Sequence, residues 1–317
     1  MCIRDSVDTD WLARRGVAFA AAEGCNAETV SQFVLAAVLL LCERRGADPT
    51  GRTLAVIGVG RIGGRVARWA ETLGLRTLLC DPPRRRSGEA GFIDAAEALP
   101  RADFVTLHVP LTDTGPDATR DLVDAAWLAR MRPSAVLINT SRGGVVREEA
   151  LAAALAAGRI GGAVLDVWRN EPHIDPALLR RTTLATPHIA GYSHEARRRA
   201  VAMIRRSLAT FAQAAVPPPT PPGPEPPEQA SLLAPPPSLP ASAPPWRQIA
   251  AVVRAARPLE TLDAELRAAA DRGAIAEKFD DLRRRCGEWR EFSAYRLSPA
   301  VLAPGTIELL ATLGFAR

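Results

Sequence analysis

Apolar and polar positions alternate along the chain in a way that predicts a parallel sheet covered by helices. Between residues 51 and 191, short apolar runs are separated by stretches whose apolar residues recur at helical spacing. Strands that are apolar on both faces are typical of a parallel sheet buried on both sides. The predicted strands are Thr53–Val59, Arg76–Cys80, Asp103–Val109, Ala135–Asn139, Gly162–Val167 and Thr183–Thr186. The predicted helices between them are Arg61–Leu73, Asp94–Leu99, Ala125–Met131 and Glu148–Ala157.

The regions on either side of this alternation have different patterns. Residues 26–45 predict an apolar helix with Asn26 as a plausible N-cap, and residues 194–215 predict one more helix. Val216–Pro245 is crowded with proline, which indicates an extended linker of the polyproline type. Trp246–Arg317 regains helical periodicity and aromatic residues, so we expect a small separate domain there.

The composition argues against a nucleic-acid site, a membrane span and a cysteine metal site. The chain has a net charge of +5, but its basic residues are scattered among acids in helical stretches, which favours a solvated face over a nucleic-acid site. The longest apolar run, Phe33–Cys42, is shorter than the about 20 residues that a membrane span needs. The five cysteines show neither CxxC nor metal-ligand spacing. We therefore expect a reduced cytoplasmic protein with no metal, membrane or nucleic-acid partner.

A glycine-rich turn follows the first predicted strand and opens a helix. Gly58 permits the tight turn, Gly60 lets the backbone approach a pyrophosphate, and Gly63 allows close packing of helix on strand. The helix N-terminus then offers free N–H groups to the phosphates, and Arg61 could add a charge. Because this loop stands between a strand and a helix, it predicts a dinucleotide site that also includes Ile62.

An acidic residue follows at the end of the second predicted strand. Asp81 comes after Gly63 at close to the spacing of about 20 residues from which a carboxylate can bind both ribose hydroxyls. Its charge would repel a 2′-phosphate, so NAD is favoured over NADP. Arg84, Arg85 and Arg86 leave the other cofactor open, because basic residues here can hold that phosphate. Asp81 could also be a turn residue before proline.

Three loops after later strands carry the groups that hydride transfer on a hydroxy acid requires. That chemistry needs a cation for the carboxylate, a base of near-neutral pKa and a carboxylate that orients the base. The loops Ile138–Gly144, Leu165–Pro172 and Thr186–Tyr192 supply these types in order. Active sites in open α/β sheets gather at the carboxyl ends of strands, so the three loops should meet.

At these loops the chain resembles the D-2-hydroxyacid dehydrogenase family, which combines a glycine-rich loop with Asn-x-x-Arg-Gly, Asp-x-aromatic-x-x-Glu-Pro and Pro-His loops. The resemblance implies that Arg142 binds the substrate carboxylate, that His188 is the acid/base and that Glu171 is its partner. Asp166 would contact the nicotinamide side. The remaining implied cofactor-lining residues are Val109, Thr140, Ser141 and Gly191.

Each catalytic candidate taken alone could be an ordinary surface or loop residue, but the three in order with matching neighbours favour a functional set. His108, His173 and His194 lack such neighbours, and we interpret them as structural or surface residues.

Other segments narrow the resemblance to one branch of the family. Glu23–Ala27 and Leu79–Pro83 resemble that branch, as do Lys278–Arg283 and Glu288–Ser293 in its C-terminal dimerisation domain. The resemblance implies a homodimer that oxidises 4-phospho-D-erythronate at C2 with NAD, for pyridoxal phosphate synthesis. Tyr192 would contact the substrate.

The resemblance also implies a domain organisation. The fold class is α/β: a Rossmann-type doubly wound parallel sheet, the remnant of a flavodoxin-like substrate domain and a small α+β dimerisation domain. Residues 26–191 would form the NAD-binding domain with its crossover helix, and residues 246–317 the dimerisation domain. Residues 1–25 and 192–215 would be what remains of the substrate domain, and residues 216–245 the linker.

The family begins with about a hundred residues of substrate domain, and the match here starts only near Val7. We therefore expect a chain shortened at its N-terminus and inactive or poorly folded, whose longer parent is active. Arg147 also stands where relatives often have Asp.

Two other interpretations stay open. The chain could act on another 2-hydroxy acid, of the phosphoglycerate or glyoxylate/hydroxypyruvate type. It could also be an inactive dinucleotide-binding scaffold of the corepressor kind, against which the intact catalytic set argues.

Overall fold

The computed structural model describes residues 7–212, 231–233, 239–240, 242–286, 289–298 and 302–316. Its centre is a six-stranded parallel sheet with the order β2-β1-β3-β4-β5-β6, which confirms the predicted doubly wound α/β architecture of this part. The strands are β1 Thr53–Ile57, β2 Arg76–Cys80, β3 Phe104–Leu107, β4 Val136–Asn139, β5 Gly162–Leu165 and β6 Leu184–Ala185.

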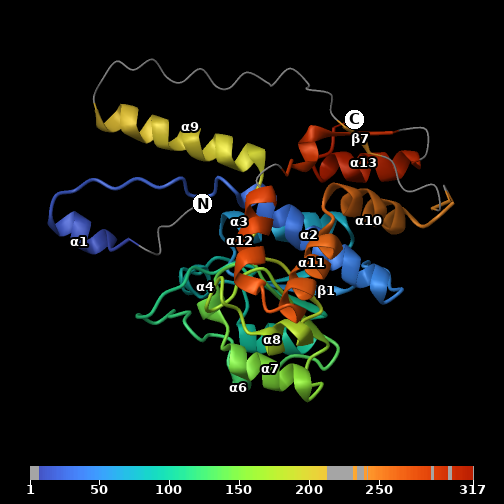
Figure 1. The fold of residues 1–317 in the computed structure, drawn as a ribbon, viewed down its shortest axis with the longest axis horizontal. Helices are drawn as coiled ribbons and strands as arrows, with labels where there is room; N and C mark the ends of the chain where they lie inside the picture. Colours follow the sequence, from blue (N-terminus) through green and yellow to red (C-terminus); the bar gives the residue numbers. More distant parts are fainter. Residues whose placement is uncertain are drawn as a thin grey trace.

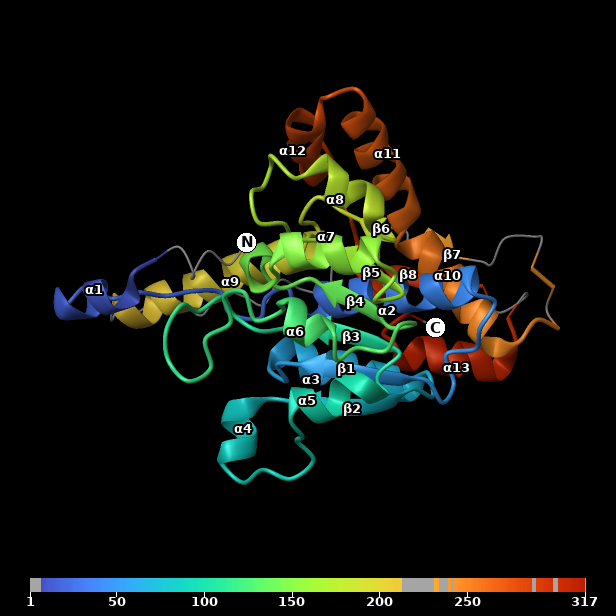
Figure 2. The same cartoon turned by 90° about the horizontal axis from the view of Figure 1, so that it is seen from below.

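Helices cover both faces of the sheet (Figures 1 and 2). On one face lie α2 Ala27–Arg44, which is buried along most of its length, and α3 Arg61–Thr72. On the other face lie α6 Ala125–Leu128 and α7 Glu148–Ala156. Because both faces are covered, strands β3, β4 and β5 are buried along their whole length, which explains the apolar runs that predict them. Strands β2 and β3 lie on opposite sides of β1, so the direction of the strand order reverses at β1. The loops after β1 and β3 diverge at this point, which leaves a crevice at the carboxyl ends of the strands.

The sequence prediction is wrong in its details at several places. Five of the six predicted strands extend one to three residues beyond the observed ones. Apolar residues in the following loops, such as Val59, Val109 and Val167, contribute to this excess. Three short helices are not predicted, since each begins at a capping acid or a proline and is too short to show helical periodicity. These helices are α1 Thr9–Arg14, α4 Pro82–Arg86 and α8 Pro176–Arg181. Asn26 does precede α2, but in the described structure its side chain makes no capping hydrogen bond.

The C-terminal segment packs directly onto α2 and α3. It consists of α10 Pro245–Ala256, α11 Leu259–Asp271, α12 Ile275–Arg285, η5 Phe292–Ala294, β8 Tyr295–Leu297 and α13 Pro304–Thr312. The ring of Phe292 stacks on Phe315 at 4.3 Å and faces Trp69 of α3 at 6.4 Å. Val253 of α10 is fully buried in the same hydrophobic core as α2. The C-terminal segment is thus a covering layer of the Rossmann part in this chain.

Much of the predicted proline linker, and Glu288 of the C-terminal resemblance, lie outside the described residues. Within the linker range, Ser231–Leu233 forms the short strand β7, which pairs in parallel with β8 and was not predicted. The division of the chain into domains stays a prediction. Among the described helices, none combines the length and the hydropathy that crossing a bilayer requires.

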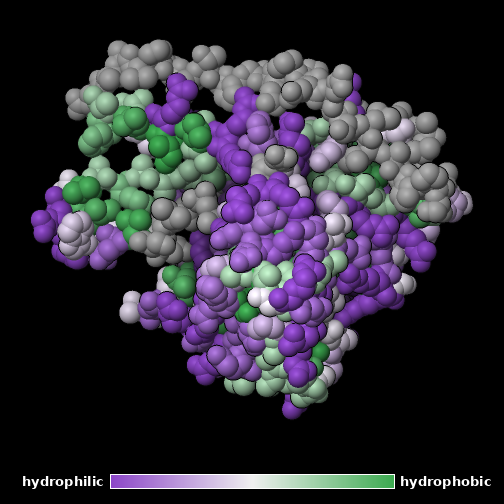
Figure 3. Space-filling view, in the orientation of Figure 1, coloured by the Kyte–Doolittle hydropathy of each residue, from purple (hydrophilic) through white to green (hydrophobic). Residues whose placement is uncertain are grey.

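Helix α9, His194–Phe211, extends away from the sheet together with the N-terminal segment around α1 (Figure 1). Apolar side chains on this part are unusually exposed, and Figure 3 shows them as a continuous green area over α9 and the N-terminal segment. The exposed residues are Trp11, Val17, Phe19, Val201, Ile204, Leu208 and Phe211.

Cysteines and arginines in the described part are unremarkable in their chemistry. Cys25, Cys42, Cys80 and Cys286 are free and buried, and burial raises the thiol pKa of Cys80 to about 12.

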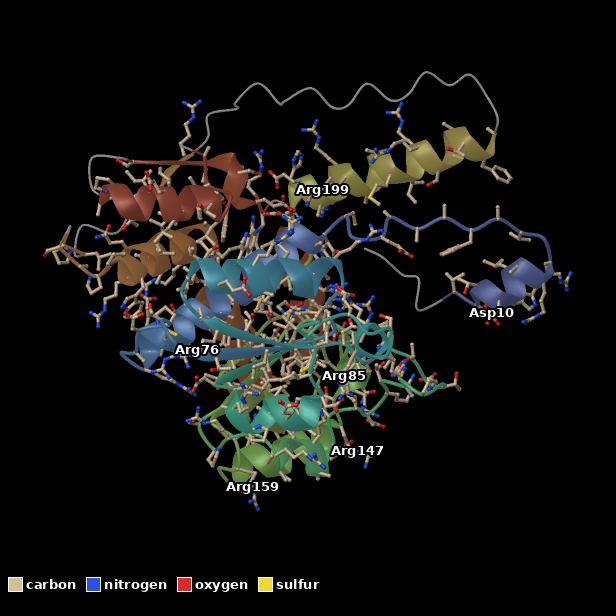
Figure 4. The ribbon with its side chains drawn as sticks, turned by 180° about the vertical axis from the view of Figure 1, so that it is seen from behind. Asp10, Arg76, Arg85, Arg147, Arg159 and Arg199 are labelled. Carbon is tan, nitrogen blue, oxygen red and sulfur yellow. The ribbon has the colours of Figure 1, made fainter. Side chains whose placement is uncertain are left out.

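Figure 4 shows the labelled arginines of the Rossmann part spread around its outside rather than gathered on one face. This spread agrees with the interpretation of the basic residues as a solvated surface.

Candidate active site

A cavity of about 710 Å³ opens where the loops after β1, β3, β4, β5 and β6 meet the start of α9. Its size lies within the range of roughly 300–1,000 Å³ that is usual for small-molecule and cofactor sites. Eleven sequence-predicted residues line it: Gly60, Arg61, Ile62, Val109, Thr140, Ser141, Arg142, Asp166, His188, Gly191 and Tyr192. The three separate loops therefore do come together, at the carboxyl ends of the strands as expected.

The glycine loop has the tight turn and the close backbone contacts that its three glycines predict. Gly58 has a φ of 86°, and a Cβ there would lie 2.7 Å from the carbonyl oxygen of His108. A Cβ on Gly63 would approach the carbonyl oxygen of Gly58 more closely than real Cβ atoms do. At Gly60, by contrast, a Cβ would meet no described atom within 4 Å. Gly60 also begins α3 without a side-chain cap, so the helix N-terminus is open to a phosphate group.

Asp81 lies beside this loop and not on the cavity wall. Its Oδ2 accepts a hydrogen bond from Val59 N at 2.9 Å, and its Oδ1 accepts one from Arg84 N at 3.2 Å, which caps α4. The carboxylate thus already performs the turn-forming role that the sequence left open, and it fixes the glycine loop to β2. A ribose contact of Asp81 stays a prediction.

The three arginines after Asp81 have acidic partners. Arg84 donates to Glu89, Arg85 to Asp94 at 2.9 Å and Arg86 to Asp117 at 2.8 Å. The hydrogen bond from Arg84 holds the pKa of Glu89 below its usual value. These arginines are therefore engaged by surface carboxylates.

The Arg142 loop is held in shape by Asn139 at the end of β4. Asn139 Nδ2 donates to Arg142 O at 3.0 Å, while its Oδ1 accepts from Ser141 N at 3.0 Å. A Cβ on Gly143 would overlap the backbone at Trp168, so the β4 and β5 loops touch here. The Asn-x-x-Arg-Gly spacing therefore has a physical reason: Asn closes the loop, Arg lines the cavity and Gly allows the contact.

His188 and Glu171 form a hydrogen-bonded pair at the edge of the cavity. His188 Nδ1 lies 2.7 Å from Glu171 Oε2, and their side chains are 20% and 19% exposed. Glu171 Oε1 accepts from Trp168 N at 2.8 Å, which fixes the carboxylate. Because Nδ1 faces Glu171, Nε2 is the ring nitrogen available to a substrate.

Asp166 anchors the loop that carries His188. This carboxylate is buried and accepts hydrogen bonds from Thr186 Oγ1 at 2.7 Å, Ile189 N at 2.8 Å and Ala190 N at 2.9 Å. Burial raises the pKa of Asp166, while His188 and these hydrogen bonds act to lower it. His188 itself has a φ of 56°, and its N–H donates to Asp166 O at 2.6 Å. Asp166 lines the cavity as predicted, and its oxygens hold the histidine loop in this conformation.

Four predicted residues do not line the cavity. Gly58, Gly63 and Asp81 support the glycine loop from behind, and Glu171 stands behind His188. Several lining residues lay outside the predicted site: Glu23, Gly24, Cys25, Asn26, Val30, His108, Pro110, Ala196, Arg197 and Ala200. Those on α2 and α9 could not be found from strand ends, because they reach the cavity only through helix packing.

His108, which the sequence led us to interpret as a structural or surface residue, lies on the cavity wall at the carboxyl end of β3, beside the predicted Val109. Its Nε2 lies 3.0 Å from Thr106 Oγ1, while its Nδ1 is buried without a hydrogen-bond partner in the described structure. Burial lowers the pKa of His108 to about 3, so the ring is neutral. Thr140 Oγ1 is a second buried, unpartnered polar atom on this wall within the described part.

The match to a known family covers the sheet and its loops. Residues 39–190 match the family model described as D-isomer specific 2-hydroxyacid dehydrogenase, NAD binding domain. The erythronate-4-phosphate dehydrogenase of Salinibacter ruber is 49% identical over 209 residues, which are 64% of this chain and 53% of that protein. The enzyme of the same name from Azotobacter vinelandii is 45% identical over 214 residues, 68% of this chain and 56% of that protein. The chain thus spans about half the length of the curated relatives it matches.

Solved structures agree with this match at the level of the fold. The NAD-dependent formate dehydrogenase from Staphylococcus aureus in complex with NAD has a TM-score of 0.56 and 26% identity, covering 66% of this chain and 69% of that one. The NADPH-dependent glyoxylate/hydroxypyruvate reductase from Sinorhizobium meliloti has a TM-score of 0.55 and 30% identity, covering 66% of this chain and 72% of that one.

Proposed function

Because this chain belongs to the D-isomer specific 2-hydroxyacid dehydrogenase family, we propose that it carries the cofactor site and acid/base pair of an erythronate-4-phosphate dehydrogenase. The observation that carries this proposal is the meeting of Arg142, His188 and the open glycine loop around one cavity, with Glu171 bonded to His188. The reaction would oxidise 4-phospho-D-erythronate to 2-oxo-3-hydroxy-4-phosphobutanoate in pyridoxal 5′-phosphate synthesis.

The described residues fit a dinucleotide. Gly60 leaves open space at the N-terminus of α3, and Thr140 Oγ1 and His108 Nδ1 are buried on the wall with no hydrogen-bond partner in the described part of the chain. NAD is favoured over NADP because Asp81 is acidic and because Arg84 to Arg86 are engaged by surface acids. Gly58 and Gly63 would hold the loop, and Val109, Ser141 and Gly191 would line the cofactor. When bound, the nicotinamide ring accepts a hydride from C2 of the substrate.

The protein's part in the reaction would fall to Arg142 and His188, which line the same cavity. Arg142 would pair its guanidinium with the substrate carboxylate, for which a planar fork is better suited than an ammonium. His188 Nε2 would take the proton of the C2 hydroxyl as the C2–H bond breaks, which leaves a 2-oxo acid. Glu171 stabilises the imidazolium that forms, through its hydrogen bond to Nδ1. Tyr192 would contact the substrate from the start of α9.

We extend the proposal to the domain organisation. Residues 1–25 and 192–215 would belong with a flavodoxin-like substrate domain, which the exposed apolar face of α9 supports. Residues 246–317 would mediate a homodimer, as the resemblance implies, in addition to covering α2 and α3.

The test of the proposed function is a substrate panel. NADH formation or consumption is followed with 4-phospho-D-erythronate, 3-phosphoglycerate, glycerate and glyoxylate, each at several concentrations. We expect the highest kcat/KM with 4-phospho-D-erythronate, and relative rates decide the outcome even if absolute rates are low. A higher kcat/KM with one of the other acids would replace the proposed substrate. NADH binding without turnover of any acid would favour the inactive scaffold only if a version extended at the N-terminus also fails to turn over these acids.

A further inference from the structure

Four consecutive residues at the start of α9 are each held by the C-terminal segment. Arg283 Nη2 of α12 donates to the hydroxyl of Tyr192 at 3.0 Å, and its guanidinium lies 5.6 Å from the centre of that ring. His194 N donates to Trp289 O at 2.8 Å. Ser193 Oγ donates to Glu291 Oε1, and Glu195 Oε2 accepts a hydrogen bond from Glu291 N. Contacts on every residue of a turn fix its orientation as well as its position.

Glu291 is the centre of these contacts. It is 2% exposed, and its Oε1 accepts hydrogen bonds from Thr29 Oγ1 at 2.6 Å and Ser193 Oγ at 3.2 Å. Its Oε2 accepts from Arg199 Nη1 of α9 at 2.8 Å. Its own N–H donates to Glu195 Oε2 at 2.9 Å. One buried carboxylate thus joins α2, the first turn of α9 and the C-terminal segment.

Arg199 carries the connection on to the cavity. Its Nε donates to Cys25 O at 2.7 Å, and Cys25 lines the cavity. Figure 4 shows Arg199 where α9 meets the rest of the molecule. Beyond this point α9 is held less: Leu208 is 63% exposed and Phe211 70% exposed. The orientation of α9 at the cavity therefore depends strongly on the Glu291 contacts.

The α9 residues that these contacts hold face the substrate side of the site. Tyr192, Ala196, Arg197 and Ala200 line the cavity, and Gly191 follows the loop of His188. Arg197 adds a cation to this wall, which suits an anionic substrate. Among the described residues, the hydrogen bonds of the glycine loop go to Cys80, Asp81, Arg84 and Glu23, and none of these belongs to the C-terminal segment.

We propose that Glu291 and Arg283 are positioning residues, which set the start of α9 and thereby the affinity of the site for its anionic substrate. They act through Tyr192, Ser193 and Arg199, and they leave NADH binding on the glycine loop unchanged. This inference rests on the proposed function for the identity of the substrate, but not for the mechanical role of the two residues.

The central variant is Glu291→Gln, which keeps the size and a hydrogen-bond acceptor but removes the charge that pairs with Arg199. The matched control is Glu265→Gln, because Glu265 is also a carboxylate of the C-terminal segment and forms its ion pairs with Lys278 and Arg285, away from α9. We expect KM for 4-phospho-D-erythronate to rise about tenfold in Glu291→Gln, since a small misplacement of a binding wall is costly. The NADH dissociation constant should stay within about twofold in both variants, and the control should keep the wild-type KM.

A second measurement does not require turnover. Hydrogen exchange in the free protein should become faster at residues 191–200 in Glu291→Gln and stay unchanged at residues 58–64. If Glu291→Gln does not fold, Arg283→Met is measured in its place, with the same expectation for KM and exchange. Unchanged exchange at residues 191–200, or an equal loss of NADH affinity, would overturn the inference. Faster exchange at 191–200 in a protein that does not oxidise 4-phospho-D-erythronate would support the positioning role and contradict the proposed substrate.

Discussion

Two walls face the same cavity and are built in different ways. The glycine-loop wall, residues 58–63, is formed by one contiguous stretch whose backbone geometry determines its shape. The α9 wall, residues 191–200, is held at residues 192–195 by side chains and backbone groups about a hundred residues further along the chain. The comparison teaches that a cofactor site can be read from a short motif, whereas the substrate wall depends on long-range packing.

The strongest way to break the glycine-loop wall is Gly63→Ala. The added Cβ would collide with the carbonyl oxygen of Gly58, so the loop backbone must shift. Overpacking of this kind costs about 1–3 kcal/mol, and we expect a lower unfolding midpoint together with loss of NADH binding. Urea unfolding and NADH fluorescence titration measure the two effects.

The matched control is Gly60→Ala, whose Cβ would meet no described atom within 4 Å. It should fold as stably as the wild type and still bind NADH more weakly, because the methyl group would fill the space for the pyrophosphate. Wild-type NADH affinity in Gly60→Ala would show that the dinucleotide does not lie over this loop.

The sequence predicts the glycine-loop wall well for a physical reason. Gly58, Gly60 and Gly63 act through local backbone conformation, and a strand before them and a helix after them are visible as apolar patterns. The loops that carry Arg142, Glu171 and His188 are predictable for a related reason. They follow β4, β5 and β6, which are parallel neighbours, so the residues after these strands lie close together.

The α9 wall and its support could not be predicted in the same way. Glu291 reads as one acid among many in the sequence, and only folding brings it against Arg199 and Thr29. The position of His108 on the cavity wall was not predicted, because no motif neighbour marks this residue in the sequence. Pairings between residues so far apart have no periodic signal in a single sequence.

A smaller effect concerns His108, which supports the glycine loop, and the pH dependence of the free energy of unfolding. His108, whose carbonyl lies against Gly58, has its pKa lowered by burial from 6.5 to about 3. Below pH 6.5 His108 binds a proton in the unfolded chain but stays neutral in the folded protein. The free energy of unfolding therefore falls as the pH drops from 6.5 towards 3. In His108→Gln this component should vanish. The slope between pH 6.5 and 4 should then be shallower by up to about 1.4 kcal/mol per pH unit.

The measurement is urea unfolding of both proteins at several pH values. Acid pairs elsewhere, such as Asp113 with Arg120, lose stability equally in both and cancel in the comparison. Identical slopes would show that His108 is protonated in the folded protein at pH 4.

The central claim is that turnover depends on His188 while NADH binding depends on the glycine loop. The variant His188→Asn tests this claim most directly. The variant removes the proposed acid/base, and we expect the glycine loop and its contacts to stay in place. We expect the rate of NAD-dependent oxidation of 4-phospho-D-erythronate to fall by about 10²–10⁴-fold, with the NADH dissociation constant unchanged within about twofold. A turnover rate equal to that of the wild type would remove His188 from the chemistry and contradict the account.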